Sequence, residues 1–459
     1  MKGFATADTT LETTWDLSVA RPASAAHWSL AFAGLLFYVV VEYTRLPAMY
    51  PFLSVFRLGK IAIVLATLGY LVSPRLRVSS RPATRGFDLA IVVFVLGNLV
   101  SACLAPEQEY VWEGFLDVLG WGAIYFLITR ILINSWRVRV FLFLLLLLNL
   151  KLAQHAIRQY IAERAMGLSD MRIITGGGLI GGSTGFFGNA ADLGLAMCVV
   201  WAIAWALLVG KTEKKKLPRV FLIICFALFL LVIVLCGSRG AVVGAGAIVL
   251  AALARTPRKI GAVALALLFL VCISLVLPDA SKQRFRSAWD WENDANAASR
   301  VMFWKAGLGM FRDHPVFGVG PDNFPQVYRT QYLDSPNAVV FAAHSVYIQA
   351  LAETGLVGTA LLVALVVLFL RLNARTRKHA LASSPAGRRS FEYCLALGLD
   401  LALVGYLASG AFLSVLYYPH LWILLGLSVA ANTASANKLP QEQAAEKQSQ
   451  ERDFALAAS

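Results

Sequence analysis

The sequence predicts an all-α polytopic membrane protein with about twelve transmembrane helices and a large outward loop that contains amphipathic helices. Two observations carry this prediction. Hydrophobic residues make up 58% of the 459 residues and charged residues only 15%, and the mean hydropathy is +0.66. Soluble domains are far more polar. In addition, apolar runs of about 20 residues, the length that a helix needs to cross a bilayer, recur along the whole chain.

These runs define the expected spans in chain order. No removable signal peptide is expected before the first run, because the first 26 residues mix Asp, Glu, Thr and Arg and lack an apolar h-region. The twelve runs are centred near residues 35, 65, 96, 124, 147, 200, 228, 247, 268, 362, 402 and 427.

Lysine and arginine fix the expected orientation, because cytoplasmic loops carry the excess of these residues. Alternate connections are cationic, whereas Pro106 to Glu113 has three Glu and no cation, and Pro278 to Ala343 has seven cations against seven carboxylates. Both termini are therefore expected in the cytoplasm. The five groups expected inside are Arg75, Arg77, Arg81 and Arg85; Arg130, Arg137 and Arg139; Lys211, Lys214, Lys215, Lys216 and Arg219; Arg255, Arg258 and Lys259; and Arg371, Arg375, Arg377, Lys378, Arg388 and Arg389.

The formal charge of +14 follows largely from this topology. The basic residues are dispersed over short connections and form no single stripe, so nucleic acid is excluded as a partner. Four regions result: 1–277 with nine spans and a Gly-rich outward segment at 160–189, 278–343 as the outward loop, 344–436 with three spans, and 437–459 as a disordered cytoplasmic tail.

The Gly-rich segment contains Arg172 and the run TGGGLIGGSTG over 175–185. It is no Walker A loop, because no Gly-Lys-Ser/Thr closes it and it faces away from cytoplasmic ATP. Two interpretations stay open: a flexible connection or re-entrant turn, and a backbone that bends close to a ligand.

The outward loop of about 65 residues is longer than a connection needs, which is typical of functional loops. Ser299 to Phe311 is predicted to be a helix with Ser299 as its N-cap. Its apolar face would hold Val301, Phe303, Trp304, Leu308 and Phe311 and lie on the membrane or on the bundle. Glycines and prolines in HPVFGVGP, residues 314–321, predict a tight irregular turn.

Two titratable side chains at the outer face are candidates for chemistry. His344, one of six histidines, opens an apolar helix; it is either a structural residue at a helix entrance or a general base. Arg239 lies between two apolar runs. Its side chain either snorkels to lipid phosphates, or its planar guanidinium group donates paired N–H bonds to a bound phosphate. His314 lies in the turn and is expected to be structural.

Four motifs in order resemble those of the O-antigen ligase and polymerase superfamily: CGSRGA at 236–241, SRVMFWKAG at 299–307, DHPVFGVGPDNF at 313–324, and His344-Ser345 followed by LAETGLVG at 351–358. They spread over roughly residues 185–365. The N-terminal spans resemble the family only in hydropathy, and Ser345 stands where the family often has Asn.

The resemblance implies a GT-C-like glycosyltransferase of the bacterial inner membrane with a periplasmic active site, which needs no cofactor and no metal. The implied reaction is glycosyl transfer from an undecaprenyl-diphosphate-linked glycan, and one elaborated outer loop without a long second one favours a ligase that uses the lipid A core as acceptor. Arg239 and Arg300 match the family's motif arginines and would hold the diphosphate, with Arg172 as a third candidate. His344 would activate the acceptor hydroxyl, and nearby arginines and the N-terminus of its helix should lower its pKa.

Other functions stay open. A polymerase that extends the glycan, or an oligosaccharyltransferase that uses protein hydroxyls, would share the motifs. A metal-dependent enzyme could use Asp290, Glu292 and Asp294. A transporter is disfavoured, because ionisable residues are few near the midplane of the spans, where the acidic candidates are Glu42, Asp88, Asp117 and Asp400.

Overall fold

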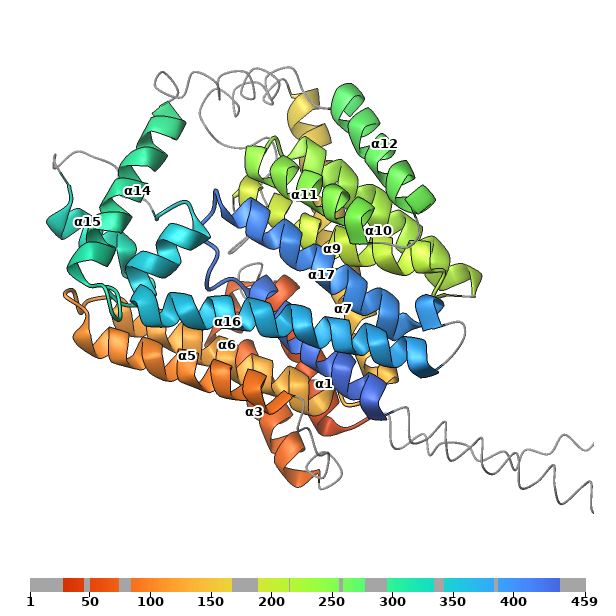
Figure 1. Ribbon diagram of the computed structural model, residues 1–459, viewed down its shortest axis with the longest axis horizontal. Helices are drawn as coiled ribbons and strands as arrows, with labels where there is room; N and C mark the ends of the chain where they lie inside the picture. Colours follow the sequence, from red (N-terminus) through yellow and green to blue (C-terminus); the bar gives the residue numbers. More distant parts are fainter. Residues whose placement is uncertain are drawn as a thin grey trace, which may run out of the picture.

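The computed structural model describes residues 28–44, 50–73, 84–166, 189–213, 215–255, 259–276, 295–333, 342–383 and 387–437. The described residues form helices joined by short turns, and no strand is found among them (Figure 1). The helices are α1 (Leu30–Thr44), η2 (Pro51–Phe56), α3 (Leu58–Val72), α5 (Arg85–Leu104), α6 (Val111–Ile131), α7 (Ser135–Ala165), α9 (Ala190–Gly210), α10 (Lys216–Leu235), α11 (Arg239–Arg255), α12 (Lys259–Val276), α14 (Ala295–Asp313), α15 (Phe324–Gln331), α16 (Val346–Ser383), η5 (Gly387–Arg389), α17 (Phe391–Gly410) and a last helix over 419–437.

Each of the twelve predicted span centres lies in one of these helices. Seven helices in the described part are long and apolar enough to cross a membrane: α5, α6, α7, α9, α10, α16 and α17. The chain is therefore a multi-pass membrane protein. α1 and α3 have 15 residues each, which at about 1.5 Å per residue is shorter than the roughly 30 Å hydrocarbon core. The number of twelve spans stays a prediction.

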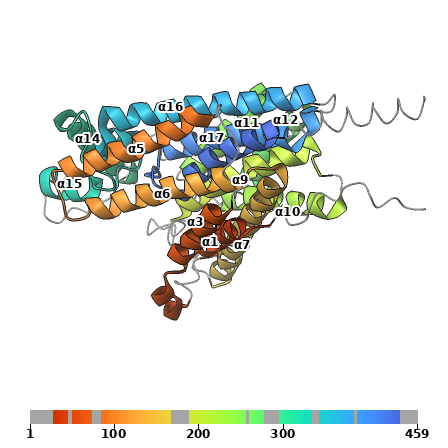
Figure 2. The same ribbon diagram turned by 90° about the horizontal axis from the view of Figure 1, so that it is seen from below.

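The centre of the bundle is formed by α9 and α17, which pack along each other and are the most enclosed of the long helices. α10 and α11 pack on α9, and α11 and α16 pack on α17. Figure 2 shows α5, α6, α16 and α17 running in the same general direction, so that the bundle has two distinct ends. A continuous apolar core fills the space between these helices.

The described parts of the connections predicted to face the cytoplasm lie at one end of the bundle. Arg130 of α6 pairs with Asp88 of α5 at 2.6 Å, and Ser135 donates a hydrogen bond to Glu392 at 2.6 Å. The last helix ends here too, since the Asn437 amide donates to the Ile133 carbonyl at 2.9 Å. Both ends of the described chain thus lie at the cation-rich end, because Trp28 stacks edge-on against Trp136. Which membrane face this end meets stays a prediction.

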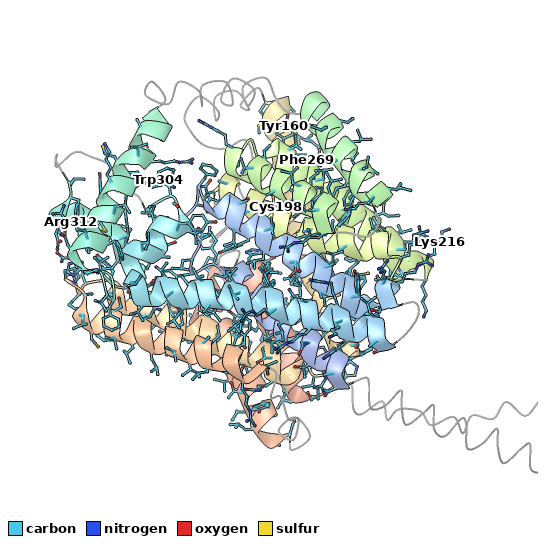
Figure 3. All side chains as sticks on the ribbon, in the orientation of Figure 1. Tyr160, Cys198, Lys216, Phe269, Trp304 and Arg312 are labelled. Carbon is cyan, nitrogen blue, oxygen red and sulfur yellow. The ribbon has the colours of Figure 1, made fainter. Side chains whose placement is uncertain are left out.

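The opposite end carries α14 and α15. α14 packs on the first turns of α16, and a small second core of Phe303, Ala306, Met310, Phe324 and Tyr328, with neighbours, joins them. Trp304 and Arg312 mark α14 in Figure 3, far from Lys216 at the cation-rich end of α10.

The prediction that Ser299 is the N-cap of α14 was wrong. The helix begins at Ala295, so Ser299 lies inside it and is not the N-cap. The three alanines at positions 295, 297 and 298 favour helix and extend it upstream. The buried stripe is Phe303, Ala306 and Met310, whereas Leu308 is 48% exposed. Phe303 and Met310 of this stripe join the second core, which also contains Phe324 and Tyr328.

Candidate functional site

Two of the sequence motifs pair with each other at the outer end of α16. The chain after α14 runs beside the first turns of α16, where the amide of Val319 donates to the Ala352 carbonyl at 2.9 Å and that of Gly320 to Glu353 at 3.1 Å. On the other side of the pairing, the Leu356 amide donates to the Pro315 carbonyl at 2.8 Å. The turn predicted over 314–321 therefore forms a clasp around α16. Its hydrogen bonds satisfy backbone groups that the break in the helix would otherwise leave without partners.

Two glycines make this clasp possible. Gly355 interrupts α16 with φ 60° and ψ −161°, a conformation that is essentially restricted to glycine. Gly318 has φ 74° and lies directly against the Glu353 backbone, so that a Cβ there would meet it at 2.5 Å. A Cβ at Gly355 would meet the Val316 carbonyl oxygen at 2.5 Å. A backbone can approach another this closely because the glycine that faces it has no side chain.

Glu353 lies at the centre of the clasp and is only 1% exposed. Its carboxylate accepts hydrogen bonds from the amides of Asp322 at 3.3 Å and Phe324 at 3.4 Å, and from the Gln349 side chain at 3.2 Å. Ser101 of α5 donates to the Glu353 backbone carbonyl at 3.1 Å. This one carboxylate therefore fixes the turn that precedes α15, since a buried carboxylate is stable only where donors surround it.

His344 precedes α16 and is held in a defined backbone conformation. Its φ is 49°, in the left-handed region, and its amide donates to the Ser414 hydroxyl at 2.8 Å. The imidazole lies against the ring of Phe303 on α14, with 6.0 Å between the ring centroids. Burial, and secondly the positive charge of Arg300, lower the pKa of His344 to about 4. The ring is therefore neutral at pH 7.

The direction of this pKa shift agrees with the expectation, but its main cause differs. The sequence suggested nearby arginines and the N-terminus of the following helix as causes. In the structure the largest cause is burial of the ring beneath α14, and Arg300 is second. A contact between α14 and the residue before α16 cannot be seen in either segment alone.

Arg239 is the first residue of α11, at the same end of the bundle as His344. The Ser409 hydroxyl at the end of α17 donates to the carbonyl of Gly240 at 3.0 Å. Phe412 also lies against Gly240, within 3.5 Å of where a Cβ would stand. The short segment 409–414 thus contacts the start of α11 through Ser409 and the residue before α16 through Ser414. It brings Arg239 and His344, 105 residues apart in the sequence, to one region.

Of the predicted site residues, the structure gathers Arg239, Arg300 and His344 at this end. Arg300 lies on α14, one turn before Phe303, and interacts electrostatically with His344. Arg172 and the Gly-rich run lie outside the described residues, as do Asp290, Glu292 and Asp294. His314 caps the end of α14: its amide donates to Met310 and its carbonyl accepts from Gly318.

The region that contains these residues is similar to a known protein family. Residues 224–363 match the model of the O-antigen ligase family. This match supports membership of the chain in the O-antigen ligase superfamily. Members of this superfamily are glycosyltransferase-like enzymes, ligases and polymerases, and their substrates are in general lipid-linked glycans and lipid acceptors. No curated protein matches the chain.

The matched segment runs from α10 into α16 and includes Arg239, Arg300 and His344. Ser409 and Ser414, which anchor the two regions, lie beyond it. Sequence reasoning missed both serines. Their only signal was the short polar break between two apolar runs, at residues 409–419, which is the same kind of interruption that singled out Arg239.

Other polar residues at this end were also missed. Tyr418 donates to Asp192 in the first turn of α9 at 3.0 Å. The pKa of Asp322 is raised to about 6, first by burial and then by the charge of Asp117. Acidic side chains therefore also lie at the end of the bundle that carries His344.

Proposed function

We propose that the protein is an O-antigen ligase, which transfers a glycan from undecaprenyl diphosphate to a sugar hydroxyl of the lipid A core at the periplasmic face of the bacterial inner membrane. One observation carries the proposal: a neutral, partly buried His344 lies beside Arg300 and is tied through the segment 409–414 to the start of α11 at Arg239. A base and two fixed cations are what this reaction requires.

The acceptor hydroxyl attacks the anomeric carbon of the donor sugar, and its proton passes to His344. The bond from that carbon to the diphosphate oxygen breaks, and the diphosphate leaves with the bonding electrons. The growing negative charge needs stabilisation, which Arg239 and Arg300 provide as preorganised cations. Attack opposite the leaving group inverts the anomeric configuration. No metal is required for any of these steps.

The environment of His344 suits this role. A general base has to be unprotonated before the reaction, and burial keeps the ring neutral at pH 7. The donor would lie between the spans and α14, with its prenyl tail in the bilayer. α14 has Met302 and Leu308 half exposed, which gives the helix an apolar surface on which the tail could lie.

A polymerase or a protein oligosaccharyltransferase would use the same residues, so the acceptor has to be identified from the glycan products that cells make without the protein. The test is a deletion strain. A ligase is indicated when lipid A loses all glycan and polymerised lipid-linked chains accumulate. Lipid A that bears a single repeat unit would instead indicate a polymerase, and unaltered lipid A with unglycosylated protein would indicate an oligosaccharyltransferase.

A second test addresses the residues. His344→Ala should abolish complementation of the deletion strain while the protein still inserts into the membrane, because general-base groups contribute about 10²- to 10⁴-fold. His314→Ala serves as the matched control, since His314 is in the adjacent turn and should tolerate replacement. Activity that survives in His344→Ala would refute the assignment. Loss of activity on treatment with EDTA would favour the metal-dependent alternative.

A further inference from the structure

A polar pocket lies at the cation-rich end of the bundle, opposite to the end that carries His344. It has a volume of about 370 Å³ and is formed where the end of α11 meets α16 and α17. The size falls within the range of small-molecule sites. Its lining residues are Arg255, Leu370, Arg377, Tyr393, Leu397 and Asp400.

The floor of the pocket is a satisfied polar network. Asp400 is only 1% exposed and accepts hydrogen bonds from Arg377 at 2.5 Å and from the Asn373 amide at 2.8 Å. Asn373 in turn accepts a hydrogen bond from Ser428 at 2.8 Å. The Asp400 carboxylate can be buried away from water because these donors replace the hydrogen bonds that water would make to it. Arg377 forms the shorter ion pair with Asp400.

Arg255 is a second cation at this site and forms a longer ion pair with Asp400. Its guanidinium comes to 3.8 Å from Asp400, beyond hydrogen-bond distance, and its side chain is 43% exposed. It does not cap its own helix either, because Lys259 donates to the carbonyls of Leu253 and Ala254 at the end of α11. Two arginines against one carboxylate leave a surplus positive charge in the pocket.

The surplus charge and the planar guanidinium groups suit an oxyanion with several acceptor oxygens. Arginine binds phosphate through paired N–H donors, and the Tyr393 side chain on the pocket wall offers a hydroxyl as a further donor. We propose that this pocket binds a phosphate-bearing anion, and that the headgroup of an anionic phospholipid supplies it. This proposal does not depend on the function proposed for the opposite end.

The surroundings favour a lipid over a soluble phosphate. Leu370 and Leu397 give the pocket an apolar side. On the same face of α16, one turn nearer the middle of the helix, Val367 is 39% exposed, and Val363 one turn further is 59% exposed. Acyl chains could follow this exposed stripe while the headgroup stays with the arginines. Basic pockets between membrane helices bind anionic headgroups in this manner.

The test uses the full chain in nanodiscs. Wild-type protein is compared in phosphatidylcholine alone and in phosphatidylcholine with a quarter phosphatidylglycerol, with the melting temperature and native mass spectrometry as readouts. Phosphatidylglycerol should raise the melting temperature and remain bound to the wild type. Arg255→Gln should reduce its retention about 10-fold, and Arg255→Lys, which keeps the charge but loses the fork, should fall between. Arg255 is exposed at a helix end, so these variants should fold.

Arg375→Gln is the matched control, because Arg375 is an exposed arginine on α16 outside the pocket; it should retain the lipid as the wild type does. A third arm adds inorganic phosphate to protein in phosphatidylcholine. If phosphate alone stabilises the wild type and not Arg255→Gln, the anion site stands with a soluble ligand. The proposal is overturned if neither ligand stabilises the wild type, or if Arg375→Gln loses retention as much as Arg255→Gln.

Discussion

The backbone amide of His344 donates a hydrogen bond to the hydroxyl of Ser414 at 2.8 Å, across 70 residues of chain. Because His344 has φ 49°, a conformation that non-glycine residues rarely adopt, this bond helps to hold a strained backbone directly before α16. A strained backbone conformation of this kind persists only where contacts with surrounding residues hold it in place. The relationship makes Ser414 a positioning residue for the proposed base.

Ser414→Ala should therefore lower the turnover of glycan transfer without removing it. One hydrogen bond contributes about 1 kcal/mol, which corresponds to a decrease of about 3- to 10-fold. Ser414→Thr keeps the hydroxyl and should restore most of the activity. The measurement is transfer by purified protein, with KM separated from kcat. An equal loss in both variants would show that the hydroxyl does not position His344.

The rate of transfer should depend on pH through His344 in one direction only. Its pKa of about 4 lies below the ordinary value of 6.5, so the ring is neutral from neutral pH down to about pH 5 and becomes protonated as pH falls further. The base is then lost and the rate declines.

The same pKa shift affects stability. The folded state binds this proton more weakly than the unfolded state, so the free energy of unfolding falls as pH drops from about 6.5 towards 4.

The carboxyl of Asp322, with a pKa of about 6, titrates in an overlapping range. The pH profile is therefore recorded for the wild type and for Asp322→Asn, and the decline that both share is assigned to His344. A shared midpoint near 6.5 would contradict a buried, neutral ring.

The clasp should be sensitive to methyl groups at its glycines. Gly355→Ala and Gly318→Ala each force a side chain into a positive φ and against backbone at 2.5 Å. The cost of the backbone conformation alone is about 1–2 kcal/mol. Both variants should lower the melting temperature in detergent. Gly246→Ala is the control, because nothing lies within 4 Å of its added Cβ; if it destabilised the protein equally, the clasp would not be the cause.

Glu353→Ala should loosen the turn before α15. The change removes the acceptor for the amides of Asp322 and Phe324 and leaves the buried amide of Phe324 without a partner, at a cost of about 1–3 kcal/mol. Limited proteolysis or hydrogen exchange of residues 324–331 should report faster opening. Glu353→Gln keeps one acceptor oxygen and should show a smaller effect. Unchanged exchange in Glu353→Ala would exclude this carboxylate as the organiser of the turn.

Much of the fold was predictable from composition and periodicity. The apolar runs placed a helix at every expected centre, since about 20 apolar residues in a membrane have few alternatives to a helix. The cationic connections also meet at one end, as alternate loops must when successive spans reverse direction. Asp88 and Asp400, two of the acidic residues considered for transport, turn out to be ion-paired with Arg130 and Arg377.

The sequence by itself determined the class of the protein and the motif residues, because these depend on hydropathy and on short patterns. Only the tertiary structure decided the face of α14 that is buried, the pairing of the two motifs around Gly355, and the placement of Arg239 and His344 at one end of the bundle through the segment 409–414. Each of these depends on contacts between segments far apart in the chain. Such contacts are set by packing and by long-range hydrogen bonds, which no local pattern encodes.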